Sequence, residues 1–112
     1  MSATNKVQLT GNLGGNPEIK TFDNGNKVAR FSMATKEEYK TRTGEKAEDT
    51  QWHYVSAWGK MAEHIEAEFK KGSFVSVEGR LTTRSYNDKS GQKKYITEIV
   101  ANNVVLKQKE DN

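Results

Sequence analysis

The sequence contains no cysteine, only one proline and no apolar run long enough to cross a membrane. Without cysteine, disulfide bonds and thiolate metal sites are both excluded. The missing apolar run predicts no membrane contact, and the lack of a charged-then-apolar leader makes a cytoplasmic protein the expectation. Hydrophobic residues fill only 33% of the 112 positions, which predicts one small domain with a thin core that oligomerisation would help to stabilise.

Charge of one sign is not in large excess either, because the formal net charge is only +3. The acidic side chains cluster, with several of them at Glu45, Glu48, Asp49, Glu63, Glu66 and Glu68. A basic cluster lies elsewhere, at Arg80, Arg84, Lys89, Lys93 and Lys94. This separation indicates a local basic surface that a polyanion could follow. The alternative, that these are ordinary solvated loop charges, stays open.

Short runs of β-branched and aromatic residues alternate with Gly, Asn and Asp, which indicates a β domain. Strands are expected over residues 5–13, 18–21, 27–37, 51–58, 74–85 and 94–106. Asn24-Gly25 predicts a hairpin turn, and residues 39–50 are expected to form a polar stretch with a turn at Thr43-Gly44. Over residues 60–71 the apolar period becomes helical, and Gly72 ends the helix.

The order of these elements is three main strands, one helix and two more strands. It predicts an all-β fold, a five-stranded OB-fold barrel with one α-helix between strands three and four. Such a barrel closes most of its sheet edges. We therefore expect one OB-fold domain over residues 1–106 and a short, polar, frayed C-terminal tail over residues 107–112.

The sequence offers no constellation for catalysis. It has neither a phosphate-binding loop nor a nucleophile elbow. His53 and His64 lack ligand-like spacing, and His53 is expected to be packed or to lie at a subunit contact. Glu37 and Glu38 are adjacent in a strand, so they point to opposite faces and cannot act together as acid and base. We expect no enzyme activity, no metal and no cofactor.

Large rings in polar surroundings are the more informative feature. Phe31, Phe69 and Phe74 have apolar neighbours and suit the core, but four other rings do not: Tyr39, Trp52, Trp58 and Tyr86. On the strand expected over residues 51–58, Trp52 and Trp58 share one face with Tyr54 and Ser56, while Val55 and Ala57 share the other. Exposed apolar groups of this size usually mark contacts.

Basic side chains lie close to these rings along the chain. Lys36, Lys40 and Arg42 flank Tyr39, Lys60 follows Trp58, and Arg84 and Lys89 flank Tyr86. A ring can stack on an unpaired base, at about 1–3 kcal/mol per base, while a nearby cation neutralises the phosphate. Because a duplex hides the faces of its bases, the pattern favours single strands. That one or two rings instead cap the barrel or pack between subunits stays open.

Across nearly its whole length the chain resembles the bacterial single-stranded DNA-binding proteins. The matching segments are Asn5-Lys6-Val7, Gly11-Asn12-Leu13-Gly14, Pro17-Glu18, Asn24-Gly25, residues 28–35, Gln51-Trp52-His53, residues 58–63, Lys71-Gly72-Ser73, Val77-Glu78-Gly79-Arg80-Leu81 and Ser90-Gly91. Each segment alone is a weak signal, but their shared order and spacing are highly specific.

The resemblance implies a nucleoid-associated homotetramer that wraps single-stranded DNA during replication, recombination and repair. It implies stacking at Tyr39, Trp52, Trp58 and Tyr86, although relatives often have tryptophan at the first and last of these positions and phenylalanine at the third. It also implies phosphate contacts at Lys60, Lys71 and Arg84, beside those expected from Lys36, Lys40, Arg42 and Lys89. His53 matches a position linked to subunit contacts.

Relatives usually continue into a flexible linker with an acidic tip that recruits replication and repair proteins. The sequence ends at Asn112 without that segment, so recruitment of such partners is left open. Two alternatives also stay open: a primosomal OB-fold protein that acts mainly through protein contacts, and an RNA-binding OB domain that reads the 2′-hydroxyl.

Overall fold

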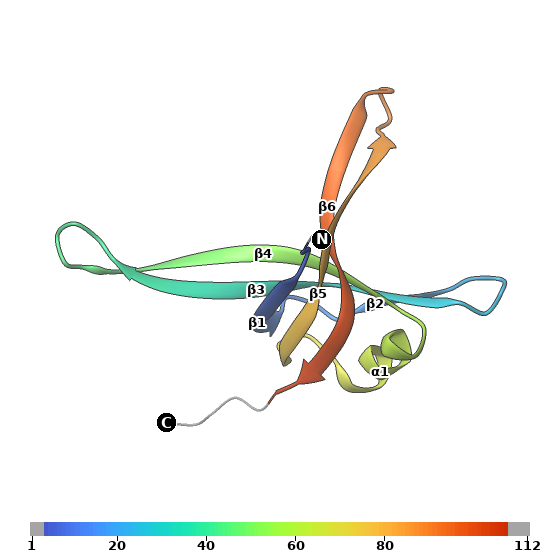
Figure 1. Ribbon diagram of the computed structural model, residues 1–112, viewed down its shortest axis with the longest axis horizontal. Coiled ribbons are helices and arrows are strands. Elements are labelled where there is room, and N and C mark those ends of the chain that lie inside the picture. Colours follow the sequence, from blue (N-terminus) through green and yellow to red (C-terminus); the bar gives the residue numbers. More distant parts are fainter. Residues whose placement is uncertain (1–3, 108–112) are drawn as a thin grey trace.

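The computed structural model describes residues 4–107, whose arrangement is shown in Figure 1. In chain order, the elements are β1 (Val7–Leu13), β2 (Glu18–Thr21), β3 (Lys27–Lys40), β4 (Lys46–Trp58), α1 (Lys60–Glu68), β5 (Phe74–Asn87) and β6 (Lys93–Leu106). The short strand β2 pairs only with β3, and the other strands form the barrel. The helix therefore lies between the third and fourth barrel strands, as the sequence predicts.

The barrel closes because β1 pairs on both sides, with β5 and with β3. On the far side β4 and β6 run parallel, with Val55 opposite Ile99. At the β1–β3 contact a Cβ atom on Gly11 would overlap the carbonyl oxygen of Ala34, so only glycine allows the two backbones to approach. The predicted OB-fold barrel is confirmed.

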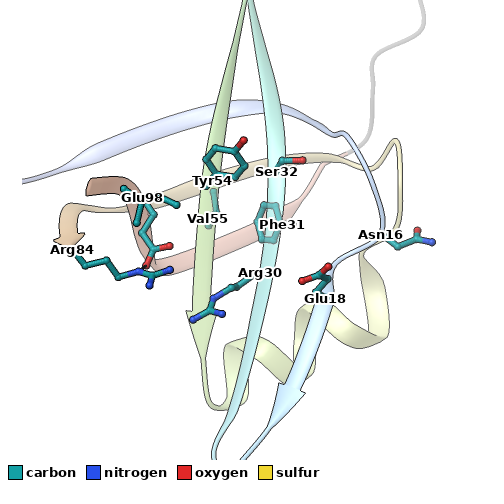
Figure 2. A pocket seen from close by; sticks show the side chains of 10 residues that line it. Asn16, Glu18, Arg30, Phe31, Ser32, Tyr54, Val55, Arg84 and Glu98 are labelled. Carbon is teal, nitrogen blue, oxygen red and sulfur yellow. Dashed lines mark ion pairs between the residues drawn. The ribbon is translucent and has the colours of Figure 1, made fainter. Parts of the chain in front are cut away.

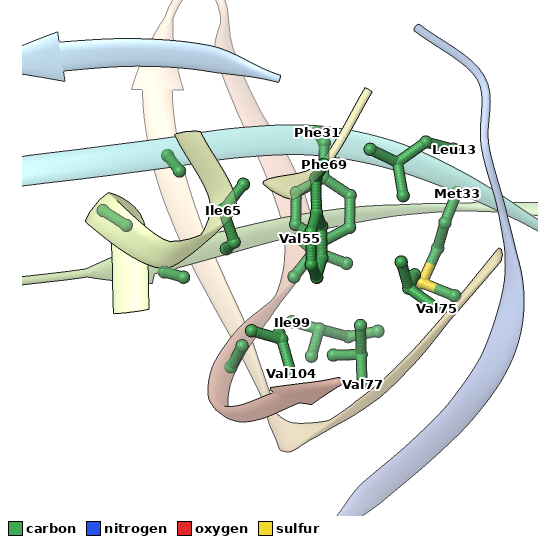
Figure 3. Close-up of a cluster of buried hydrophobic side chains, with 14 residues drawn as sticks. Leu13, Phe31, Met33, Val55, Ile65, Phe69, Val75, Val77, Ile99 and Val104 are labelled. Atoms are coloured by element: carbon green, nitrogen blue, oxygen red, sulfur yellow. The ribbon is translucent and has the colours of Figure 1, made fainter. Parts of the chain in front are cut away.

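Alternating apolar residues on the strands fill the barrel interior (Figure 3). The buried side chains come from most of the elements, with Met33, Val55, Ile65, Val75 and Val77 among the most deeply enclosed. The helix covers one end of this core, where the rings of Phe31 and Phe69 meet edge to face at 6.1 Å. Phe74, expected in the core, is only half-buried.

The polar stretch 39–50 is not mainly a loop, which corrects the sequence prediction. β3 and β4 continue as a paired ribbon to Lys40 opposite Lys46, and only the turn between them is unpaired. There, the backbone N–H of Thr41 donates to Glu45 O at 2.9 Å. Figure 1 shows this hairpin reaching far from the barrel. The outer part of the hairpin does not contact the core, so its sequence lacks the alternation of apolar residues by which a strand is predicted.

The helix is shorter than predicted, because it ends at Glu68 and not at Lys71. Phe69 already has an extended backbone, with φ −102° and ψ 140°, and its side chain remains in the core. A turn follows at once, closed by the N–H of Ser73 donating to Lys70 O at 2.9 Å. The position of Gly72 marks this turn correctly, but packing of the Phe69 ring ends the helix earlier.

Candidate nucleic-acid interface

Trp52 lies on the outer wall of the barrel, on β4, opposite the small side chain of Ala34 on β3. Its indole packs against the start of the β1–β2 connection. A Cβ built on Gly14 would lie 2.5 Å from a ring carbon of Trp52, so a glycine here makes room for the ring. The residue still exposes 57% of its surface. Trp52 is therefore supported on one side and open on the other.

Trp58, at the end of β4, has a support that the sequence analysis missed. The ring of Phe22 stacks on Trp58 with centroids 5.7 Å apart and planes inclined by 14°. The ammonium of Lys20 lies 5.0 Å from the centroid of Phe22 and adds a cation–π contact. The hairpin turn after Phe22 could have indicated this contact, because pairing of β2 with β3 brings residue 22 close to the end of β4.

Tyr39 is exposed on the distal part of the β3–β4 hairpin, opposite Ala47. Side chains alternate across a strand, so Tyr39 lies on the opposite face of this ribbon from Ala34 and its partner Trp52. Lys36 shares the face of Trp52, although it is close to Tyr39 in sequence, and pairs with Glu48 at 3.9 Å. The twist of the ribbon turns its faces along its length, so the two rings do not form one flat platform.

Tyr86 lies near the tip of the second projecting hairpin, on β5 opposite Lys94 of β6. The carboxylate of Asp88 organises the turn beyond it: the backbone N–H groups of Ser90 and Gln92 donate to this carboxylate at 2.9 Å each. The Ser90 hydroxyl donates to the same oxygen at 2.7 Å. These hydrogen bonds, led by that of the hydroxyl, lower the pKa of Asp88 below its ordinary value.

The predicted phosphate-binding side chains are distributed over the barrel and both hairpins. The exposed ones are Lys36, Lys40, Arg42, Lys60, Lys71, Arg84 and Lys89. Arg84 is held in place by Glu98, whose Oε1 lies 3.6 Å from the Arg84 Nε. The set surrounds the rings but does not converge on one point. This geometry suits a long charged chain that passes over the surface, and not a compact anion.

His53 is half-buried on the β4 face opposite that of Trp52, where its Nε2 lies 2.9 Å from the Thr35 hydroxyl. Within residues 4–107 no group of three or more His, Asp or Glu side chains is placed to hold a metal ion. None of the helices in the same range is both long and apolar enough to cross a membrane.

An OB-fold barrel whose wall and two hairpins carry exposed rings among cations defines a nucleic-acid-binding type of domain. A family model described as the single-strand binding protein family matches residues 4–107. The chain therefore belongs to the single-strand binding protein family.

Individual relatives agree with this assignment. Single-stranded DNA-binding protein 1 of Chlorobaculum tepidum is 46% identical over 103 residues, which are 91% of this chain but only 64% of that protein. A Plasmodium falciparum SSB solved in complex with ssDNA superimposes with a TM-score of 0.89 and 32% identity, over 96% of this chain and 98% of that one. A deletion mutant of the Thermus aquaticus single-stranded DNA-binding protein superimposes with a TM-score of 0.82 and 27% identity, over 94% of this chain and 51% of that one.

Proposed function

We propose that this chain binds single-stranded DNA with little sequence preference and protects it during replication, recombination and repair. The observation that carries the proposal is the exposure of four rings, Tyr39, Trp52, Trp58 and Tyr86, which leave between 46% and 57% of their surfaces open. Rings of this size stay in water at a cost unless a partner covers them. Stacked bases are such a partner, and every base has a face to offer.

The proposed mechanism divides the work between the two kinds of side chain. The four rings stack bases, while the seven exposed cations neutralise the phosphates that connect those bases. Stacking requires an unpaired base face, so duplex DNA is a poor ligand. Phosphate contacts release condensed counterions, so the affinity must fall as salt rises.

The proposal includes a homotetramer around which the DNA strand wraps. This tetramer would lie in the cytoplasm, at the nucleoid. The rings lie on the barrel wall and on two hairpins that project in different directions in Figure 1, so one strand that reaches all of them must bend around the barrel. His53 is proposed to lie at a subunit contact. Its half-buried ring, already bonded to Thr35, offers a second nitrogen to a neighbour.

The test is a titration of the protein with oligo-dT at two salt concentrations, followed by tryptophan emission and by light scattering. We expect quenching, because Trp52 and Trp58 are the emitting rings, a weaker affinity at the higher salt and the mass of a tetramer. A flat emission signal at low salt, with an intact circular dichroism spectrum, would contradict the proposal. A dimer with weak DNA affinity would favour the primosomal alternative, and stronger binding of oligo-U would favour the RNA-binding one.

A further inference from the structure

A groove on the outside of the barrel is lined mostly by residues for which the sequence predicted no role in binding, with Arg84 as the exception. It has a volume of about 320 Å³ and lies between the outer face of β3 and β4, the β5–β6 hairpin and the β1–β2 connection (Figure 2). Arg84 and Glu98 lie on one side of Tyr54 and Arg30, and Asn16 and Glu18 lie on the other. Its volume is at the lower end of the range for small-molecule pockets, which begins at about 300 Å³.

Tyr54 is the aromatic wall of this groove. It exposes 57% of its surface, as much as Trp52 does, and its cross-strand partner is the small Ser32. Tyr54 also lines a smaller hollow of about 210 Å³ together with Trp52 and Leu81. The ring thus stands between two hollows, with space for a flat group beside it.

The spacing between Tyr54 and Trp52 fits an extended nucleic-acid strand. The two residues are two apart on one strand face, so their Cα atoms are separated by about 6.5–7 Å. That is about twice the 3.4 Å rise between stacked bases in a duplex strand. A strand pulled out of its stacked form could therefore place successive bases on Trp52 and Tyr54.

The charges of the groove favour a neutral base over a phosphate inside it. The Glu98 side chain is only 12% exposed, so it holds a partly desolvated carboxylate at the wall, where a phosphate would be repelled. A nucleobase has no charge, and its N–H groups can donate hydrogen bonds to a carboxylate. Arg84, paired with Glu98, and the exposed Arg30 are positioned to meet the phosphates on either side of that base.

We propose that this groove holds one nucleobase of the bound strand and that Tyr54 is a fifth stacking ring. In this arrangement Glu98 is a positioning residue, which orients the guanidinium of Arg84. The proposal depends on the proposed single-strand binding and adds a base position between Trp52 and the β5–β6 hairpin.

The test compares three variants by fluorescence anisotropy of a labelled oligo-dT, a signal that does not depend on the protein's own tryptophans. Tyr54→Ala should weaken binding about tenfold, the loss expected for one stacked base. Tyr54→Phe keeps the ring and should stay within about twofold of the unchanged protein. Tyr95→Ala is the matched control: Tyr95 exposes 66% of its surface, lies on β6 opposite Ser85 and does not line the groove. It should also stay within about twofold.

Photocross-linking gives a second readout, which a merely structural role of Tyr54 would not produce. An oligonucleotide that carries iodouracil should cross-link to the Tyr54 side chain, as located by fragmentation of the adduct-bearing peptide, and Tyr54→Ala should abolish that adduct while adducts at Trp52 remain.

Equal weakening by Tyr54→Ala and Tyr95→Ala would overturn the assignment. A change of oligomeric state in Tyr54→Ala would overturn it as well, because the ring would then be a subunit contact. In both cases the unchanged protein would still bind oligo-dT. A failure of the proposed function would instead remove binding from every variant, the unchanged protein included.

Discussion

Two pairs of rings serve the same proposed purpose with very different support. The barrel rings, Trp52 and Trp58, rest on distant parts of the chain: the first on Gly14 and the second on Phe22. The hairpin rings, Tyr39 and Tyr86, lie on two-stranded ribbons, opposite Ala47 and Lys94. All four are exposed to a similar extent, so exposure does not distinguish them.

The difference concerns the entropy that binding must remove. A ring already held against a neighbour loses little freedom when a base stacks on it, whereas a ring on a projecting ribbon must be ordered at that moment. The barrel rings should therefore contribute more affinity per ring. The hairpin rings extend the surface that one strand can cover.

The largest effect should come from removing a barrel ring. We expect Trp52→Ala to weaken oligo-dT binding by about 1–3 kcal/mol, the range for one stacked base. Tyr39→Ala should weaken binding less, because part of the stacking energy of this ring is used to order its side chain. Anisotropy titrations of both variants under one salt condition make the comparison. A larger loss for Tyr39→Ala would show that prior ordering does not decide the contribution of a ring.

The next effect separates the support of a ring from the ring itself. Gly14→Ala adds a Cβ that would lie 2.5 Å from the Trp52 indole, so the ring must move. We expect a shift of the tryptophan emission and a weaker affinity, by less than the loss in Trp52→Ala.

Gly15→Ala is the matched control for this substitution, because nothing lies within 4 Å of a Cβ built there. Its emission and affinity should remain those of the unchanged protein. If the two variants bound equally well, the packing of Trp52 on Gly14 would have no role in binding.

A smaller effect is expected from the support of Trp58. Phe22→Ala removes an aromatic stack, worth about 0.5–1.5 kcal/mol beyond the buried area. Thermal unfolding should move to a lower temperature, and the affinity for oligo-dT should fall modestly. Phe22→Tyr keeps the ring and should preserve both quantities. An unchanged affinity in Phe22→Ala would mean that the stacking of Phe22 on Trp58 has no role in DNA binding.

The smallest effect should appear in the pH dependence of the β5–β6 turn. The pKa of Asp88 is lowered in the folded protein by the Ser90 hydroxyl and by backbone N–H groups. Its stabilising contribution is therefore complete above the ordinary aspartate pKa, about 4, and is lost as the pH falls through the lower folded value.

Unfolding measured between pH 7 and pH 3 tests this prediction. Asp88→Asn removes the titrating group, so the variant should lose less stability on acidification than the unchanged protein. Parallel curves for the two proteins would show that the turn is not held by the ionised carboxylate.

Much of the fold follows from local patterns along the chain. Alternating apolar residues around Phe31 and Val55 predicted barrel strands, and the helical period before Gly72 predicted the helix between them. The outer ribbon of β3 and β4 was not predicted, because strand pairing holds it together and burial, which leaves a pattern in the sequence, does not. The helix ended before Phe69 because the ring of this residue packs on Phe31 in the core, and a contact between residues so far apart cannot be predicted from a local sequence pattern.

The candidate site divides in the same way. The sequence by itself indicated that four rings, Tyr39, Trp52, Trp58 and Tyr86, lie outside the core, because each stands among polar neighbours. Only the tertiary structure decided what each ring rests on, that Tyr39 and Trp52 take opposite faces of one ribbon, and that Tyr54 borders a groove with Arg84 and Glu98. Those properties depend on strand register and on barrel closure, which bring together residues far apart in the chain.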